Sequence, residues 1–129
     1  MYYKATRGIW GEIAQKTLGT YGTVSLVEAL QAIGRLPTKN HYTGIFPEAD
    51  KICGETIRKK YRVAKRSCFS CFIQCKYIVS VEAEQYRLYT KGPEYETVMA
   101  LGSNTMVSNL ESIFYANYLC NEMGMDTIS

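Results

Sequence analysis

The stretch from Ser108 to Gly124, SNLESIFYANYLCNEMG, carries the clearest structural signal in the chain and predicts an amphipathic helix. Ser108 is expected to be the N-cap, and Glu111, three residues later, would complete a capping box. One face of this helix carries Leu110, Ile113, Phe114, Asn117 and Cys120. Gly124 is expected to end the helix, because glycine readily adopts the left-handed conformation found there.

Three shorter helices are expected before this one, over residues 23–33, 55–64 and 93–101. The first has a rough 3.6-residue hydrophobic period and is followed by Gly34, a suitable C-terminal cap. The second would place Ile57, Tyr61 and Ala64 on one side. In the third, Pro93 suits the first helical position and Gly102 is expected to end the helix.

The remaining segments predict less regular structure. Residues 37–50 contain two prolines, Gly44 and Asn40, which favour an irregular loop. Residues 77–90 alternate loosely around Glu82–Glu84, which indicates a short hairpin. We therefore expect a mainly α, multihelical fold with at most a short hairpin, organised as a single partial domain over residues 1–129.

The composition excludes several classes of protein. Hydrophobic residues make up 47% of the 129 residues, so the chain is not a disordered tail. The formal net charge of +3 is mildly basic and, taken alone, only a weak hint about partners. The sequence has neither an apolar run long enough to span a membrane nor the apolar core of a signal peptide. We expect a cytoplasmic protein with no membrane partner.

Five cysteines are present, and three of them form the pattern Cys68-x-x-Cys71-x-x-x-Cys75. Thiolates are soft ligands, so the spacing is compatible with an iron–sulfur cluster or a zinc site. The third interpretation is that the cysteines bind no metal and are simply buried. A 4Fe-4S cluster needs a fourth ligand from elsewhere. Cys53 and Cys120 sit among apolar positions, where packing in the core is the commoner role.

Two other function classes stay open on residue chemistry alone. A small zinc-binding interaction module would use Cys68, Cys71 and Cys75 with His41 or Cys53 as the fourth ligand. A nucleic-acid binder would use the six cations in residues 58–66, although no recognisable RNA- or DNA-binding motif accompanies them.

Two polar segments are candidates for a site. In Gly92-Pro93-Glu94-Tyr95-Glu96, both carboxylates stand at a helix start, where they interact favourably with the helix dipole in solvent. The alternative is that one of them is buried beside a metal or substrate. In residues 121–126, NEMGMD, Asp126 is either an ordinary turn residue or a hydrogen-bonding partner of a polar ligand.

Six segments in order resemble the aldehyde ferredoxin oxidoreductase family, and specifically the first of its two helical domains. The segments are GTYGTV (19–24), GRLPTKNH (34–41), ICGETIR (52–58), KRSCFSCFIQC (65–75), KGPEYETVMALGSN (91–104) and LCNEMGMDTIS (119–129). Residues 76–90 match poorly. Together the segments cover most of the chain from about residue 16 onward.

The resemblance implies an enzyme that oxidises aldehydes to carboxylic acids at a tungsten, or molybdenum, bis-pterin site. Electrons would pass through a 4Fe-4S cluster to ferredoxin. The resemblance makes Glu96 a carboxylate near the tungsten site that orients or deprotonates water or substrate. It also implies that Cys68, Cys71 and Cys75 hold the cluster. Three further residues would contact the pterin or the cluster: Asp126, Asn121 and Arg66.

The sequence also departs from the family pattern. Asn121 stands where the family motif Asp-x-x-Gly-Leu-Asp begins with aspartate, and Met125 replaces its leucine. Tyr115 and Tyr118 stand where some members have a Glu-x-x-His motif for an interface iron, so no such iron is expected. The N-terminal β domain and the downstream fourth cysteine would lie in the missing domains of a longer chain. Apolar surface left uncovered without them would favour a homo-oligomer.

Overall fold

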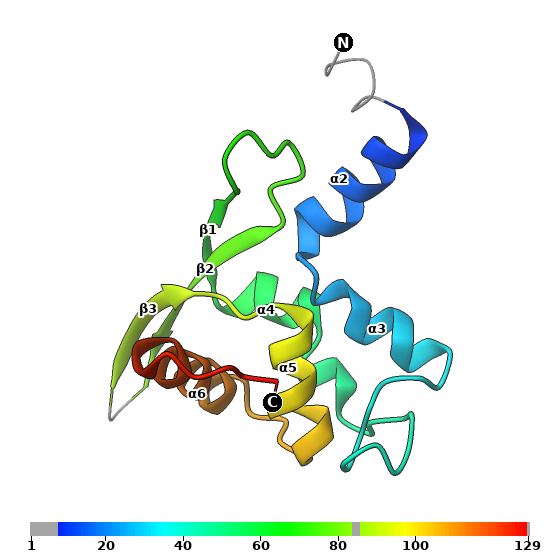
Figure 1. Ribbon diagram of the computed structural model, residues 1–129, viewed down its shortest axis with the longest axis vertical. Helices are drawn as coiled ribbons and strands as arrows, with labels where there is room; N and C mark the ends of the chain where they lie inside the picture. Colours follow the sequence, from blue (N-terminus) through cyan, green and yellow to red (C-terminus); the bar gives the residue numbers. More distant parts are fainter. Residues whose placement is uncertain (1–7, 84–85, 129) are drawn as a thin grey trace.

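The computed structural model describes residues 8–83 and 86–128 (Figure 1). The helices in this part of the chain are α2 (Ile9–Tyr21), α3 (Ser25–Ala32), α4 (Gly54–Lys60), α5 (Tyr95–Leu101) and α6 (Leu110–Met123). Two short 3-10 helices are η1 (Ala49–Lys51) and η2 (Ser103–Thr105). The strands are β1 (Arg62–Arg66), β2 (Lys76–Glu82) and β3 (Arg87–Lys91). The expected mainly α fold is confirmed.

Helix α6 follows the sequence prediction except at its first turn. Its inward face is buried at Leu110, Ile113, Phe114 and Asn117, as the periodicity predicts. Gly124 ends it in the left-handed conformation, with φ 66°. The predicted cap at Ser108 is wrong, because the side chain of Asn109 accepts the hydrogen bond from the Ser112 amide. Asparagine is among the strongest N-cap residues, and here it begins the helix one residue later.

The expectation of at most a short hairpin is wrong, because the strands form a three-stranded antiparallel sheet in the order β1-β2-β3. The β2–β3 hairpin is the one predicted, although part of its turn, residues 84 and 85, lies outside the described residues. The third strand, β1, comes from a segment predicted to finish a helix at residue 64. Helix α4 ends at Lys60 instead, and the backbone from Arg62 onward pairs with β2.

The other predicted helices are present with small shifts. Helix α3 lies within the predicted range, and Gly34 caps it with φ 68° and a hydrogen bond to the Gln31 carbonyl. Helix α5 begins at Tyr95, so Pro93 precedes the N-cap, Glu94, and does not occupy the first helical position. Gly102 follows its last residue, as predicted. Helix α2 was not predicted.

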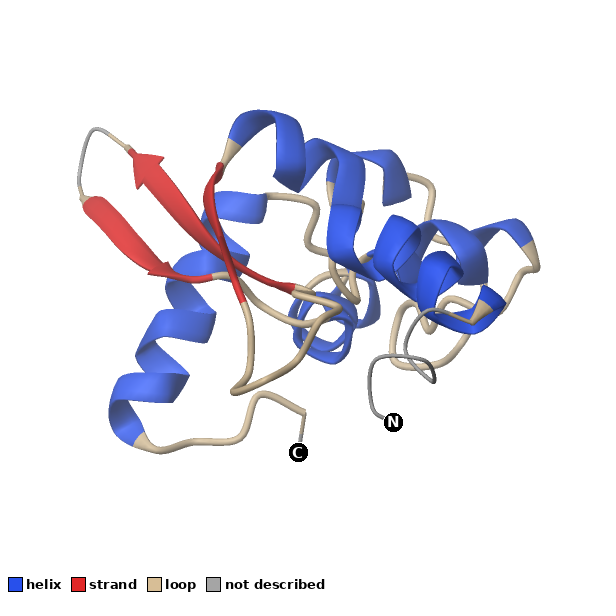
Figure 2. Cartoon of the chain, turned by 90° about the horizontal axis from the view of Figure 1, so that it is seen from above, coloured by secondary structure: helices blue, strands red, loops and turns tan. Residues whose placement is uncertain are grey.

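The core lies where helices α3 to α6 meet each other and the sheet (Figures 1 and 2). Its fully buried large side chains include Leu36, Phe46, Ile52, Ile57, Val79, Val98, Ile113 and Phe114. Tyr61 holds α6 beside the end of α4, with its ring edge-on to Phe114 at 5.2 Å between centroids. Tyr86, next to β3, donates a hydrogen bond to the Glu111 carbonyl at 3.2 Å.

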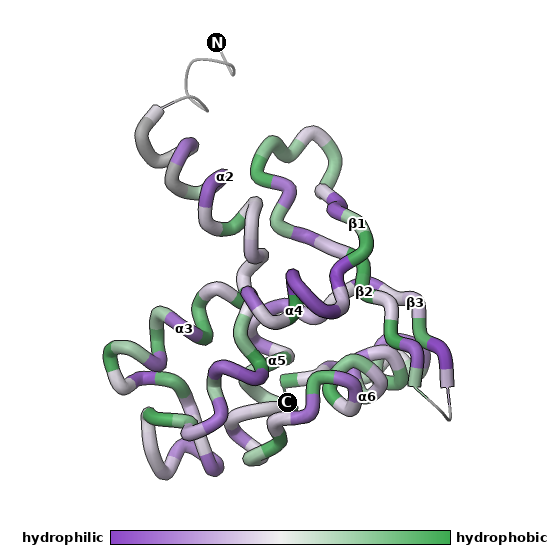
Figure 3. Tube along the Cα trace, turned by 180° about the vertical axis from the view of Figure 1, so that it is seen from behind, coloured by the Kyte–Doolittle hydropathy of each residue, from purple (hydrophilic) through white to green (hydrophobic). Residues whose placement is uncertain are grey.

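The hydropathy of the trace varies along the molecule (Figure 3). Helix α4 is largely hydrophilic, whereas the loop between β1 and β2 contains hydrophobic stretches that stand at one end of the molecule (Figure 3). None of the helices in the described ranges combines the length and apolar character needed to cross a bilayer.

Candidate cofactor and catalytic site

The three clustered cysteines lie on one loop, residues 67–75, which connects β1 to β2. Cys68 is exposed, and Cys71 and Cys75 are half-buried. The Cys71 amide donates a hydrogen bond to the Cys68 carbonyl at 3.1 Å, which makes a tight turn between the first two cysteines. Phe69, inside that turn, is 100% exposed. The loop therefore presents its thiols and an aromatic ring at the surface.

The base of this loop has mixed charge. Burial, and then the nearby carboxylate of Glu94, raise the pKa of the Cys75 thiol. A hydrogen bond with the Cys68 side chain raises the pKa of the Lys76 ammonium, with a smaller contribution from Glu94. Cys68, Cys75, Lys76 and Glu94 are therefore close enough to influence one another. The acidic segment 92–96 lies beside the cysteine loop, although the two are separated in sequence.

Tyr77 connects the two segments directly. It is 2% exposed, and its hydroxyl donates a hydrogen bond to the Pro93 carbonyl at 2.7 Å. The Gly92 amide donates to the Tyr77 carbonyl at 2.9 Å. A Cβ atom at position 92 would lie 2.0 Å from the Tyr77 ring, so only glycine allows this approach. Burial strongly raises the pKa of the Tyr77 hydroxyl, which therefore stays protonated and serves as a donor.

The two carboxylates of the acidic segment have different surroundings. Glu94 is half-buried, and its Oε2 accepts a hydrogen bond of 2.7 Å from the hydroxyl of Thr23. Glu96 is exposed, in the first turn of α5. The structure therefore fixes Glu94 within the fold and leaves Glu96 available at the surface.

A cleft of about 170 Å³ joins the two polar segments that the sequence singles out. Its lining comes from both segments and from α6, and includes Gly92, Glu94, Thr97, Asn117, Asn121 and Asp126. Thr97 and Thr127 are hydrogen-bonded across it, with 2.8 Å between their hydroxyl oxygens. Asn121 and Asp126 thus lie beside the acidic segment. Glu96 is on the same short helix, outside the lining of the cleft.

Arg66 lies at the other side of the cysteine loop. It is exposed at the end of β1 and lines a hollow of about 320 Å³ with Lys65, Ser67 and Gln74. Two cationic side chains beside a hydroxyl and an amide suit an anionic group. Arg66 is therefore next to the cysteines and is not part of the cleft that holds Asn121 and Asp126.

Several of the six segments quoted in the sequence analysis also contact one another in the fold. Gly54 packs against Tyr21, where an added Cβ would lie 3.1 Å from the Tyr21 Cβ. The amides of Lys39 and Asn40 donate to the carbonyls of Ser103 and Asn104, at 3.1 and 2.8 Å. Segments from different parts of the chain that carry the resemblance are therefore packed against one another in the fold.

Residues 3–129 match the family model described as aldehyde ferredoxin oxidoreductase, domains 2 and 3. The chain belongs to the aldehyde ferredoxin oxidoreductase family. It is 40% identical over 117 residues to the tungsten-containing aldehyde ferredoxin oxidoreductase of Pyrococcus furiosus. It is 41% identical over 120 residues to the protein of the same description from Pyrococcus horikoshii. Each comparison covers 91% of this chain and 19% of the relative, so the chain spans about a fifth of these relatives.

The donor set of this chain suits the cluster that the family implies. The three thiols share one loop, and no disulfide occupies them. In residues 8–83 and 86–128, no three His, Cys, Asp or Glu side chains are already arranged around a common point. The donor chemistry therefore fits a thiolate-bound cluster, while bringing the thiols together is left to cofactor binding. The polar lining at Asn121 and Asp126 likewise suits hydrogen bonds to a pterin.

The remaining ligand candidates lie elsewhere in the chain. Cys53 is buried at the start of α4, and its thiol is 3.1 Å from the Asp50 carbonyl, so core packing is its role here. Cys120 is half-buried on α6. The segment between α3 and η1, which contains His41, is at the opposite end of the molecule from the cysteine loop (Figures 1 and 3). His41 is therefore a poor fourth ligand.

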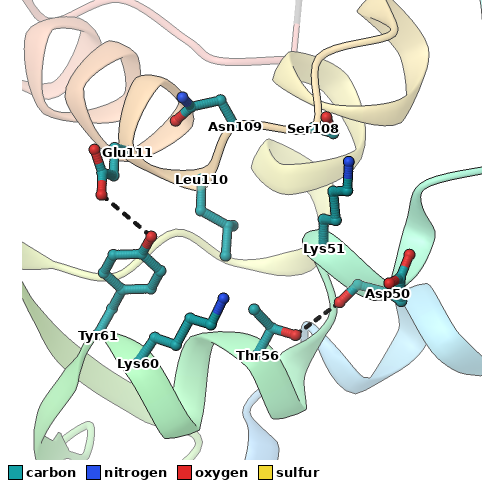
Figure 4. Close-up of a pocket in the computed structure, with 9 residues that line it drawn as sticks. All are labelled: Asp50, Lys51, Thr56, Lys60, Tyr61, Ser108, Asn109, Leu110 and Glu111. Carbon is teal, nitrogen blue, oxygen red and sulfur yellow. Dashed lines mark hydrogen bonds between the residues drawn. The ribbon is translucent and has the colours of Figure 1, made fainter.

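A third cleft, of about 430 Å³, is larger than the two described above and separate from these residues. It lies between α4 and the start of α6, and its lining mixes Lys51 and Lys60 with Asp50 and Glu111 (Figure 4). The Tyr61 hydroxyl donates to Glu111, and the Thr56 hydroxyl donates to the Asp50 carbonyl (Figure 4). None of the cysteines lines it, so its size alone does not make it the cofactor site.

The basic segment 58–66 is not one continuous cationic patch. Lys59 pairs with Glu55 at 2.7 Å, and Arg62 donates to the Thr20 carbonyl. Arg58 lies over the Tyr21 ring. The Lys59–Glu55 pair lies within α4, whereas the contacts of Arg58 and Arg62 hold α4 and β1 against α2.

Sequence reasoning missed two residues that hold this site together, Thr23 and Tyr77, and it named Glu94 without identifying Thr23 as its partner. Their roles depend on contacts across 16 to 72 positions of sequence. The poor match of residues 76–90 to the family segments gave no signal for Tyr77. For Thr23, in the segment GTYGTV, the only signal was that threonine commonly caps helices.

Proposed function

We propose that this chain works within a longer oxidoreductase polypeptide that oxidises aldehydes to carboxylic acids and delivers the electrons to ferredoxin. The observation that carries the proposal is the proximity of the cysteine loop and the acidic segment, joined by the hydrogen bond from Tyr77 to Pro93. A redox enzyme needs its electron-relay site close to its substrate site. The names of the relatives support the tungsten and ferredoxin parts of the proposal.

In this proposal Cys68, Cys71 and Cys75 would hold a 4Fe-4S cluster as thiolates, and a fourth ligand would come from another part of the polypeptide. Lys76 lies at the Cys68 side chain, where its positive charge would stabilise a thiolate and offset the negative charge of the cluster. A bound tungsten, or molybdenum, bis-pterin would supply a Lewis acid and an acceptor for the two electrons of the aldehyde.

The polar residues divide the remaining tasks. Glu96 orients water or substrate and accepts a proton at its carboxylate, for which its exposed position leaves it available. Asp126 and Asn121, which line the cleft, would hold a bound pterin by hydrogen bonds. Arg66 donates to an anionic group beside the cysteine loop.

The first test is a metal inventory of the full-length protein that contains this chain, purified without oxygen. Elemental analysis is expected to find about four iron atoms per protomer together with tungsten or molybdenum. The Cys75→Ser variant should lose most of its iron, because serine is a poor ligand for the cluster. Cys53→Ser is the matched control and should keep its iron, since the Cys53 thiol packs in the core.

Zinc as the sole metal, with neither tungsten nor molybdenum, would overturn the proposal in favour of a zinc site. An equal iron content in Cys75→Ser, Cys53→Ser and the wild type would show that the cysteine loop does not bind the cluster. Aldehyde oxidation coupled to reduction of ferredoxin, measured on the same preparations, tests the substrate and the electron acceptor separately from the metals.

A further inference from the structure

The hydroxyl of Thr23 reaches the acidic segment from a distant part of the chain. It accepts a hydrogen bond from the Tyr95 amide at 2.9 Å and donates one to Glu94 Oε2 at 2.7 Å. The two hydrogen bonds span 72 and 71 positions of sequence. One oxygen atom therefore ties both the backbone and the carboxylate at the start of α5 to the junction between α2 and α3.

Helix α5 needs this contact because it lacks a cap of its own. It runs only from Tyr95 to Leu101, and no side chain of its N-cap, Glu94, bonds its first turn. The first amides of a helix have no partner within the helix, and short helices are marginal without outside contacts. Thr23 supplies a hydrogen-bond acceptor to the Tyr95 amide, the first of these unpartnered amides.

The segment that carries Thr23 is itself fixed. Gly22 adopts a positive φ of 75°, and a Cβ there would lie 2.9 Å from the Tyr77 ring. The Thr23 carbonyl accepts from the Leu26 amide at 3.0 Å, and the Ser25 hydroxyl donates to the Gly22 carbonyl at 3.0 Å. The anchor for α5 is therefore a rigid helix junction.

We propose that Thr23 is a positioning residue for Glu96, acting through the first turn of α5. Glu96 follows Tyr95 directly, so the place of its Cα is set by the backbone that Thr23 holds. Glu94 is kept turned toward Thr23 by the same hydroxyl, which leaves Glu96 as the exposed carboxylate of the pair. This inference rests on the proposed role of Glu96.

The test compares Thr23→Val, which keeps the shape but loses the hydroxyl, with Thr23→Ser, which keeps the hydroxyl, in the full-length holoenzyme. Thr23→Val is expected to lower kcat on the order of 10- to 100-fold with little change in KM, because small misplacements of a catalytic group have effects of this size. Thr23→Ser should restore most of the activity. Thr17→Val, at an exposed threonine of α2, is the matched control.

A second measurement does not depend on activity. Amide hydrogen exchange of the peptide spanning residues 93–101 should be faster in Thr23→Val and close to wild type in Thr23→Ser and Thr17→Val. If Thr23→Val does not accumulate as holoenzyme, Thr23→Ala is used for both measurements. If the variant without the hydroxyl keeps the amide exchange and the kcat of the wild type, the inference is overturned. A loss of activity in Thr23→Ser as large as in Thr23→Val would also overturn it.

Glu96→Gln separates this inference from the function on which it rests. Full activity in Glu96→Gln would remove Glu96 from the reaction, whatever Thr23 does. An inactive Glu96→Gln together with a fully active Thr23→Val would keep the proposed reaction and reject Thr23 as its positioning residue.

Discussion

At the residue scale, Tyr77 and Gly92 are packed so closely that a side chain at position 92 has no room. The Tyr77 ring occupies the space that a side chain at position 92 would need, and its hydroxyl bonds the next residue, Pro93. Gly92 is therefore required for a close approach and not for a left-handed backbone. A glycine that precedes a proline in sequence normally indicates only a turn.

Gly92→Ala is expected to destabilise the protein by about 1–3 kcal/mol, because the new methyl group must displace a buried ring or its own backbone. The free energy of unfolding of wild type and variant, from denaturant titration, measures this cost. In a double-mutant cycle with Tyr77→Leu, the cost of the added methyl group should become smaller. The same cost in both backgrounds would show that Tyr77 is not what excludes a side chain at position 92.

At the scale of the single element, α6 shows how closely a sequence pattern defines a helix. The periodicity, the buried face and the terminal Gly124 all appear as predicted. The start is one residue off, because Ser108 and Asn109 are both good caps and the choice between them depends on the direction in which the chain enters the helix.

The cap of α6 can be tested with adjacent substitutions. Asn109→Ala is expected to cost about 1 kcal/mol of stability, because it removes the acceptor for the Ser112 amide. Ser108→Ala is the neighbouring control and should cost clearly less. Thermal unfolding of both variants under the same conditions distinguishes the two caps. A larger loss in Ser108→Ala would restore the capping box predicted from the sequence.

Strand β1 shows where the pattern within one element fails. Ile57, Tyr61 and Ala64 have helical spacing, yet the helix ends at Lys60 and the strand begins at Arg62. Backbone pairing with β2, from Arg62 opposite Val79 to Arg66 opposite Lys76, outweighs the local preference for a helix. The partner strand is on the far side of the cysteine loop, so no window centred on residues 55–64 contains the information.

At the scale of the whole molecule, α6 packs against the end of α4 and against the sheet, and this packing holds these elements together. Phe114, which is fully buried, meets the Tyr61 ring at this junction. Phe114→Ala is expected to cost about 3–5 kcal/mol. Tyr115→Ala, next to it on the exposed face, loses ring contacts with Tyr86 and Tyr118 and should cost about 0.5–1.5 kcal/mol.

Denaturant unfolding of these two variants tests the packing of the layers. Similar losses at Phe114 and Tyr115 would mean that α6 does not bury the face that contains Phe114. Circular dichroism of the folded variants is the control for helix content, because both substitutions place alanine, a good helix former, within α6.

By itself, the sequence determined the helical class, the family and the set of polar segments, because periodicity, capping glycines and motif residues act over a few positions. Only the tertiary structure decided which of those residues meet. It placed Asn121 and Asp126 beside the acidic segment, set Glu94 against Thr23, and left Arg66 on the other side of the cysteine loop. Such contacts join residues far apart in the chain, and their geometry comes from the packing of whole elements, which no local pattern encodes.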